Sequence, residues 1–229
     1  PRHRHPWDQI RYCISGSVPI APGKTLDQGE VGYFPEGLHY GPQEGPERKV
    51  MVLQFGGASG KGYLNRDEVN RAYDELGEFG KFKNGIFLRT RGNGKTDLDG
   101  YAAIWQHLTG KPLNFPSSRY SDPVIMKPSN FFWRNANVRG VQQKDLGRFS
   151  DRLTEVTIFQ LTPGKRSVIA GINHLRIIFV IKGIGKCRRK TYKRHTAIEL
   201  ASGERASFTV DVKTELLCIT IPPILTTIT

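Results

Sequence analysis

The sequence lacks the cysteine patterns of a disulfide or zinc framework. Its 229 residues include three cysteines, Cys13, Cys187 and Cys218, which are far apart and form no CxxC pair. An odd number without paired spacing disfavours both a disulfide framework and a cysteine zinc site. We therefore expect reduced thiols in an intracellular, cytoplasmic protein.

Long hydrophobic runs are also missing. No apolar stretch approaches the roughly 20 residues that a membrane-spanning helix needs, and no segment resembles a signal peptide. The chain begins at Pro1 without a methionine, so the true N-terminus and any targeting segment stay open at this stage. Hydrophobic residues make up 38% and charged residues 24% of the chain, values that are ordinary for a globular protein.

Acidic residues are scarce beside basic ones, 21 against 34, which gives a net charge of +13. Such a charge favours a polyanion or small anions as partners. The basic residues are scattered, however, with the densest run at 186–195, and no RNP, zinc-finger or helix-turn-helix pattern occurs. The glycine-rich phrases at 56–62 and 91–97 lack the spacing of a phosphate-binding loop. We expect a small anionic ligand rather than nucleic acid, and no membrane partner.

Short strand patterns punctuated by glycine and proline make up most of the sequence. They occur at 9–16, 29–34 and 48–55, and almost continuously from about 153 onward. These patterns predict an all-β protein.

Two helices interrupt this strand pattern. Asn65 with Glu68 three residues later is a capping-box arrangement at the start of the first, and Gly110 is a suitable end for the second. The proline- and serine-rich segment 111–150 predicts a strap along the protein surface with Trp133 largely buried.

The two ends of the chain resemble each other. The segment "QIRYCISG" at 9–16 matches "RIIFVIKG" at 176–183, so Gly16 is expected to align with Gly183. Later in each copy a strand turns at Gly29 or Gly203, and we pair these two glycines as well. An internal duplication of a β-unit is the simplest explanation.

Potential metal ligands stand at even spacing in the first copy, in "HRHPWDQIRY". Because side chains on a strand alternate between faces, His3, His5 and Gln9 are predicted to point the same way. The same parity directs Arg11 and Cys13 toward the interior of a barrel.

These residues resemble the cupin family, whose first motif runs G(X)5HXH(X)3–4E(X)6G. His3, His5 and the terminal Gly16 fit it, with Gln9 in the glutamate position. The second motif, G(X)5PXG(X)2H(X)3N, is approximated by Gly29, the Pro35-Glu36-Gly37 turn and His39. One residue separates Gly37 from His39 where the family pattern has two, and Gln43 stands near the asparagine position.

The resemblance implies two cupin-type jelly-roll barrels, or a bicupin. We divide the chain into an N-terminal barrel at 1–60 lacking its usual first strands, a helical insert and strap at 61–150, and a C-terminal barrel at 151–229. In that second barrel the ligand positions fall on Ile172 or Ala170 and on Arg176, so it is expected to be metal-free and structural. A homodimer is also consistent with the family.

The resemblance further implies a metal-dependent enzyme. The expected ligands are His3, His5, Gln9 and His39, and the ion is Fe(II), with Mn, Ni or Zn as alternatives. A neutral Gln9 leaves the site about one positive charge above a His/Glu site, which favours an anionic substrate. Arg11 would orient that anion.

Three functions follow from this site. The preferred one is a dioxygenase acting on a small enol, diketone or aromatic anion. The second is a metal-dependent isomerase, lyase or cyclase in which Tyr40 or Glu36 serves as acid or base. The third is a non-catalytic protein that binds a small molecule.

Overall fold

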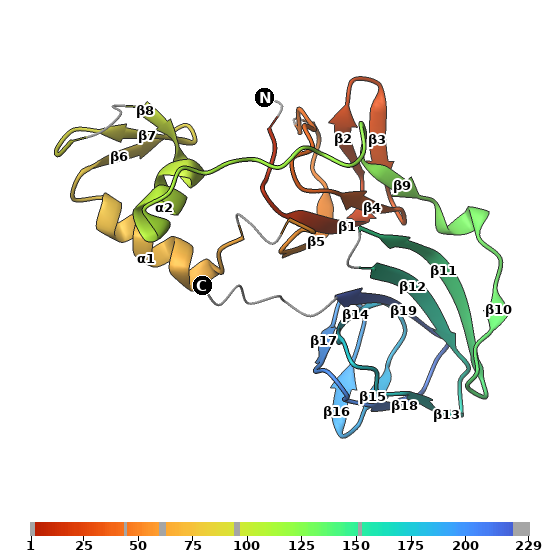
Figure 1. Ribbon diagram of the computed structural model, residues 1–229. Coiled ribbons are helices and arrows are strands. Elements are labelled where there is room, and N and C mark those ends of the chain that lie inside the picture. The colour runs from red at the N-terminus through yellow and green to blue at the C-terminus, as the bar shows by residue number, and fades with distance from the viewer. Residues whose placement is uncertain (1–2, 44, 60–62, 94–96, 151–152, 222–229) are drawn as a thin grey trace.

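The protein is represented by a computed structural model, which describes residues 3–43, 45–59, 63–93, 97–150 and 153–221 (Figure 1). Strands predominate, so the predicted all-β class is confirmed. The N-terminal part contains β1 (Asp8–Ser15), β2 (Ser17–Ala21), β3 (Lys24–Asp27), β4 (Val31–Phe34) and β5 (Lys49–Phe55). The middle contains α1 (Arg66–Leu76), β6 (Gly80–Lys83), β7 (Ile86–Arg89), β8 (Asp97–Asp99), α2 (Gly100–Thr109), β9 (Val124–Met126), a short 3-10 turn (Pro128–Asn130) and β10 (Arg134–Asn135). The C-terminal part contains β11 (Val141–Phe149), β12 (Thr154–Leu161), β13 (Arg166–Ile169), β14 (Leu175–Lys182), β15 (Gly185–Cys187), β16 (Lys190–Tyr192), β17 (Ala197–Leu200), β18 (Ala206–Val210) and β19 (Thr214–Ile221).

The N-terminal unit is built on a four-stranded antiparallel sheet in the order β5-β1-β4-β9, with the β2–β3 hairpin beside it (Figure 1). Strand β1 lies inside this sheet and is buried from Asp8 to Cys13. Its alternating faces serve two cores. Cys13 packs inside the barrel with Phe34 and Tyr40, whereas Ile10 on the other face packs toward the C-terminal unit.

The C-terminal unit consists of two facing sheets. The larger has the strand order β10-β11-β12-β19-β14-β17 and the smaller β13-β18-β15-β16. Both contribute to one apolar interior, in which Ile178 and Leu216 of the larger sheet pack with Phe208 of the smaller. The outer face of the larger sheet carries Phe179 and Leu217 into a core shared with the N-terminal sheet. The two barrels therefore pack sheet against sheet.

The pairing register of β1 in the first barrel recurs in β14 of the second barrel, which confirms that the two strands are equivalent. Gln9 pairs with Phe34 as Arg176 pairs with Leu200, and each strand ends at a glycine of positive φ, Gly16 at 77° and Gly183 at 110°. Neither segment is helical, and the predicted alignment of these two glycines agrees with the pairing.

The predicted pairing of Gly29 with Gly203 is wrong. The Gly37 N–H donates to the His5 carbonyl at 2.8 Å, and the Gly203 N–H donates to the Ile172 carbonyl at 2.7 Å, so Gly203 corresponds to Gly37. Their φ angles agree as well, at 74° and 78°. The sequence match failed because a turn glycine recurs every few residues in both copies, and only the hydrogen bonds distinguish them.

A small helical unit interrupts the first barrel sequence. Helix α1 starts with the predicted capping box, in which Asn65 Oδ1 accepts from the Glu68 N–H at 2.9 Å and Glu68 Oε2 accepts from the Asn65 N–H at 2.8 Å. Helix α2 ends at Gly110, which has a left-handed φ of 67° as expected. Both helices pack with β6–β8 around Phe87 and Leu76. None of the described helices is long and apolar enough to cross a membrane.

After α2 the chain returns across the N-terminal barrel to β9, as the green segment in Figure 1 shows. This is the course expected of the strap, but Trp133, predicted to be largely buried, is only half-buried against the shared core, with the Lys144 ammonium 4.7 Å from its ring centroid. The segment 61–150 nevertheless contributes to both sheets, since β9 pairs with β4 and β11 pairs with β12. The C-terminal sheet therefore begins before residue 151.

Candidate functional site

The candidate site lies on the interior face of β1. Alternation along the strand places Gln9, Arg11 and Cys13 on one face, as the sequence predicted. Gln9 is 1% exposed and Arg11 is 7% exposed. Polar side chains at such depth need hydrogen-bond partners within the barrel.

Gln9, Arg11 and Tyr40 form one hydrogen-bonded network. The amide oxygen of Gln9 accepts from Arg11 Nε at 3.1 Å and from Arg11 Nη2 at 2.8 Å. The hydroxyl of Tyr40 accepts from Arg11 Nη2 at 2.8 Å and from Gln9 Nε2 at 3.0 Å. The guanidinium also lies over two rings, 4.6 Å from the centroid of Phe34 and 4.8 Å from that of Tyr40. All of these partners are neutral.

The charge of Arg11 is therefore not matched by a carboxylate among the described residues. Burial lowers the pKa of the guanidinium, and Tyr40 opposes that effect. Arg11 Nη1 has no hydrogen-bond partner in the same described part of the chain. Placing an uncompensated cation at this depth costs several kcal/mol, which an anion in contact would offset.

His3 and His5 lie at the edge of this network and are partly exposed. Their ring centroids are 5.1 Å apart, and the His3 ring is 4.5 Å from that of Tyr40. His5 stacks on Trp7 with a centroid distance of 4.5 Å. Burial, followed by the charges of His3 and Arg11, lowers the pKa of His5 to about 4, so its imidazole is neutral at neutral pH.

Tyr40 occupies the position that the sequence assigned to His39. His3 and Tyr40 form an antiparallel bridge with hydrogen bonds of 3.0 Å in both directions, which puts their side chains on the same face. His39 is exposed and lines a different hollow with Arg4 and Phe115. Tyr40 also has the two-residue spacing after Gly37 that the second motif requires, a signal already present in the sequence.

Glu36 belongs to a second polar hollow and not to the network of Gln9, Arg11 and Tyr40. Its carboxylate accepts from the N–H of Ser59 at 2.8 Å and from its hydroxyl at 2.6 Å. Nearby, Asp8 accepts from the Tyr33 hydroxyl at 2.9 Å and from the Glu36 N–H at 2.8 Å. A Cβ at Gly57 would collide with the Glu36 carboxylate. Position 57 therefore requires a glycine, a constraint that the glycine-rich sequence of this loop did not by itself reveal.

This arrangement does not fit a divalent ion held by His3, His5, Gln9 and His39. The structure places His3 and His5 beside Tyr40, whose hydroxyl accepts from Gln9, but it places His39 on the opposite face. The Gln9 oxygen that would ligate the ion already accepts twice from Arg11, whose charge would repel a dication. Within the described ranges, no group of three or more His, Cys, Asp or Glu side chains is arranged to hold a metal. Metal binding itself stays a prediction.

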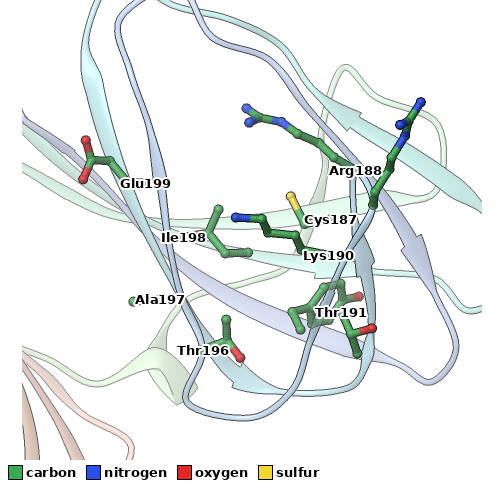
Figure 2. Close-up of a pocket in the computed structure, with 10 residues that line it drawn as sticks. Cys187, Arg188, Lys190, Thr191, Thr196, Ala197, Ile198 and Glu199 are labelled. Atoms are coloured by element: carbon green, nitrogen blue, oxygen red, sulfur yellow. The ribbon is translucent and has the colours of Figure 1, made fainter.

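The densest basic run of the sequence lines another hollow, of about 620 Å³, between the β15–β16 hairpin and β17. Figure 2 shows Arg188, Lys190 and Glu199 around it, with Ile198 between them. Arg188 and Lys190 are exposed. The charged side chains that line this hollow are exposed, whereas the cation in the interior of the first barrel is buried.

Comparisons with known proteins support the fold. No family model and no curated protein sequence matches this chain. Among solved structures, a candidate dioxygenase from Nostoc punctiforme PCC 73102 is similar with a TM-score of 0.61 and 10% identity, over 97% of this chain and 64% of that chain. A protein from Geobacillus kaustophilus has a TM-score of 0.51 and 12% identity, over 98% of this chain and 77% of that chain. At these identities the likeness concerns the fold alone, and the predicted two-barrel cupin fold is confirmed.

Proposed function

We propose that the N-terminal barrel binds a small organic anion without a divalent metal, and that Arg11 is its electrostatic anchor. The observation that carries this proposal is the buried guanidinium, which has neutral partners and no matching carboxylate among the described residues. A bound carboxylate or enolate would supply the missing negative charge.

The surrounding residues have distinct roles in this proposal. Gln9 and Tyr40 fix the Arg11 head group, which leaves its Nη1 to donate to the ligand. Burial raises the pKa of Tyr40 despite the nearby Arg11, so its hydroxyl stays protonated. The neutral imidazole of His5 at the barrel mouth offers a donor and an acceptor according to its tautomer, and the His3 ring lies beside it with a centroid distance of 5.1 Å.

Calorimetric titration with oxalate and with acetylacetone tests this function on the metal-free full chain. Native protein is expected to bind at least one of them, and Arg11→Gln is expected to weaken that binding about tenfold or more, the equivalent of one lost charged hydrogen bond. Arg166→Gln, at an exposed arginine of β13, is the matched control. Equal affinity of native protein and folded Arg11→Gln would contradict the proposal.

A metal-dependent oxidoreductase is the second candidate. It is favoured by the position of His3 and His5 beside Tyr40, which is hydrogen-bonded to Gln9, and by a fold shared with a protein described as a candidate dioxygenase. An ion at these residues would require Arg11 to leave the Gln9 oxygen. Elemental analysis after incubation with Fe(II), combined with oxygen uptake, separates the two candidates. About one ion per chain in native protein that is lost in His5→Ala would establish the metal site and refute the metal-free proposal.

A further inference from the structure

We propose that the C-terminal barrel has a ligand site of its own, which binds a small carboxylate with an apolar body through Arg176. The sequence led us to expect a purely structural second barrel. The proposal does not depend on the function of Arg11, because it rests on different residues in a different cavity.

Arg176 is a deeply buried cation. It lies on the interior face of β14 opposite Leu200 and Thr220, and it is 4% exposed. Its Nη2 donates to the backbone carbonyl of Glu204 at 2.8 Å. Its Nε is buried and has no hydrogen-bond partner within the described part of the chain. A charged donor left unsatisfied at such depth is costly, and an acceptor in contact would relieve the cost.

A cavity of about 490 Å³ adjoins Arg176 at the mouth of the barrel. Cys218 and Thr220 of β19 lie beside the guanidinium, and the side chains of Phe159 and Ile172 form the apolar part of the cavity wall. This volume is within the range of roughly 300–1,000 Å³ that small-molecule sites occupy. The wall is mixed, with Phe159 and Ile172 on its apolar side and charged side chains at its rim, so it can contact both a carboxylate and an apolar body.

The charges around the cavity select an anion. Both arginines at its rim already have acidic partners, Arg134 with Asp145 and Arg148 with Glu155, the latter at 2.7 Å. The Glu204 side chain is paired with Arg188 and gives Arg176 only its carbonyl.

The Cys218 thiol beside Arg176 does not compensate the positive charge of the arginine either. Burial raises the pKa of Cys218 to about 12 despite Arg176, so this group stays neutral. Arg176 is therefore the unmatched cation of the cavity.

The ligand geometry follows from the free donors of the guanidinium. Nε and Nη2 share one edge of the planar head group, so a carboxylate at this edge would accept from the unpartnered Nε and could also accept from Nη2, which already donates to the Glu204 carbonyl. The body of the ligand would then lie against Phe159 and Ile172. Benzoate has this combination of a carboxylate and a flat apolar ring, and it is the probe we select.

Calorimetric titration of the full chain with benzoate tests this site. Native protein is expected to bind it, Arg176→Gln to weaken that binding about tenfold or more, and the binding that depends on Arg176 to persist in Arg11→Gln. Loss in Arg11→Gln alone would assign benzoate to the N-terminal barrel and overturn this inference while supporting the function proposed for Arg11. No measurable binding to native protein at millimolar benzoate would overturn it as well.

A second variant covers the case in which Arg176→Gln does not fold. Ile172 is 37% exposed at the cavity wall, so Ile172→Trp fills the cavity without removing a buried group. It should abolish benzoate binding while the thermal transition of the protein is retained. Arg166→Gln, on the exposed face of β13, is the charge control and should bind like native protein. Unchanged affinity in Ile172→Trp would place the ligand elsewhere and refute the site.

Discussion

Gln9 and Arg176 occupy the same register position in the two barrels, Gln9 opposite Phe34 and Arg176 opposite Leu200. In the first barrel this position carries an amide that holds the guanidinium of Arg11, and in the second it carries a guanidinium itself. Each barrel thus has a buried positive charge at or beside a position where the family motif has a metal ligand, on Arg176 in the second barrel and on Arg11, two residues beyond Gln9, in the first. A positive charge there disfavours a dication and favours an anion.

Removing the Tyr40 hydroxyl should destabilise the first barrel. In Tyr40→Phe the Nη2 of Arg11 and the Nε2 of Gln9 lose a common acceptor inside the protein. We expect the free energy of unfolding to fall by about 1–3 kcal/mol. Urea denaturation measures it, with Tyr63→Phe at a 41% exposed tyrosine as the control. A Tyr40→Phe variant as stable as this control would show that the network contributes nothing.

The two histidine positions should differ in their effect on anion binding. His39 lies outside the network, so His39→Ala is expected to leave oxalate or acetylacetone affinity unchanged. His5 lies at the barrel mouth near Tyr40, with ring centroids 6.0 Å apart, and His5→Ala should weaken the affinity severalfold. Calorimetry on both variants decides the matter. The reverse order of effects would restore the ligand role that the family resemblance implied for His39.

Gly37→Ala should be more harmful than the same change at the equivalent Gly203. Both glycines have left-handed φ angles, 74° and 78°, so alanine costs about 1–2 kcal/mol of backbone strain at either position. At Gly37 the new Cβ would also collide with the Pro116 carbonyl of the strap, whereas at Gly203 no atom lies within 4 Å. The difference between the two free energies of unfolding measures the strap contact. Equal losses of unfolding free energy in the two variants would mean that the strap shifts away from the new Cβ at no energetic cost.

The three thiols should resist alkylation in the folded protein. Burial raises the pKa values of Cys13, Cys187 and Cys218, the last to about 12, so the reactive thiolate is rare at pH 8. Mass spectrometry after iodoacetamide treatment should show little modification of native protein and three modifications of urea-unfolded chain. Reaction should accelerate as the pH rises toward these pKa values. Fast modification of any one cysteine at pH 8 would contradict the burial argument.

Local patterns in the sequence determined much of the fold. The capping box at Asn65 and the glycine stop at Gly110 depend on neighbours a few residues away, and both were predicted correctly. Period-two alternation likewise placed Gln9, Arg11 and Cys13 on one face, because the geometry of a single strand fixes that relationship. The pairing of Gly16 with Gly183 followed from the strand pattern that precedes each.

Tertiary structure decided what those side chains meet. His39 and Tyr40 are neighbours in sequence, and only the bridge from His3 to Tyr40 determines which of them faces the barrel. The pairing of Gly37 with Gly203 depends on hydrogen bonds to distant strands. The partners of Arg11 and Arg176 are likewise set by the closed barrels, since a buried charge is defined by the residues that surround it and not by its position in the chain.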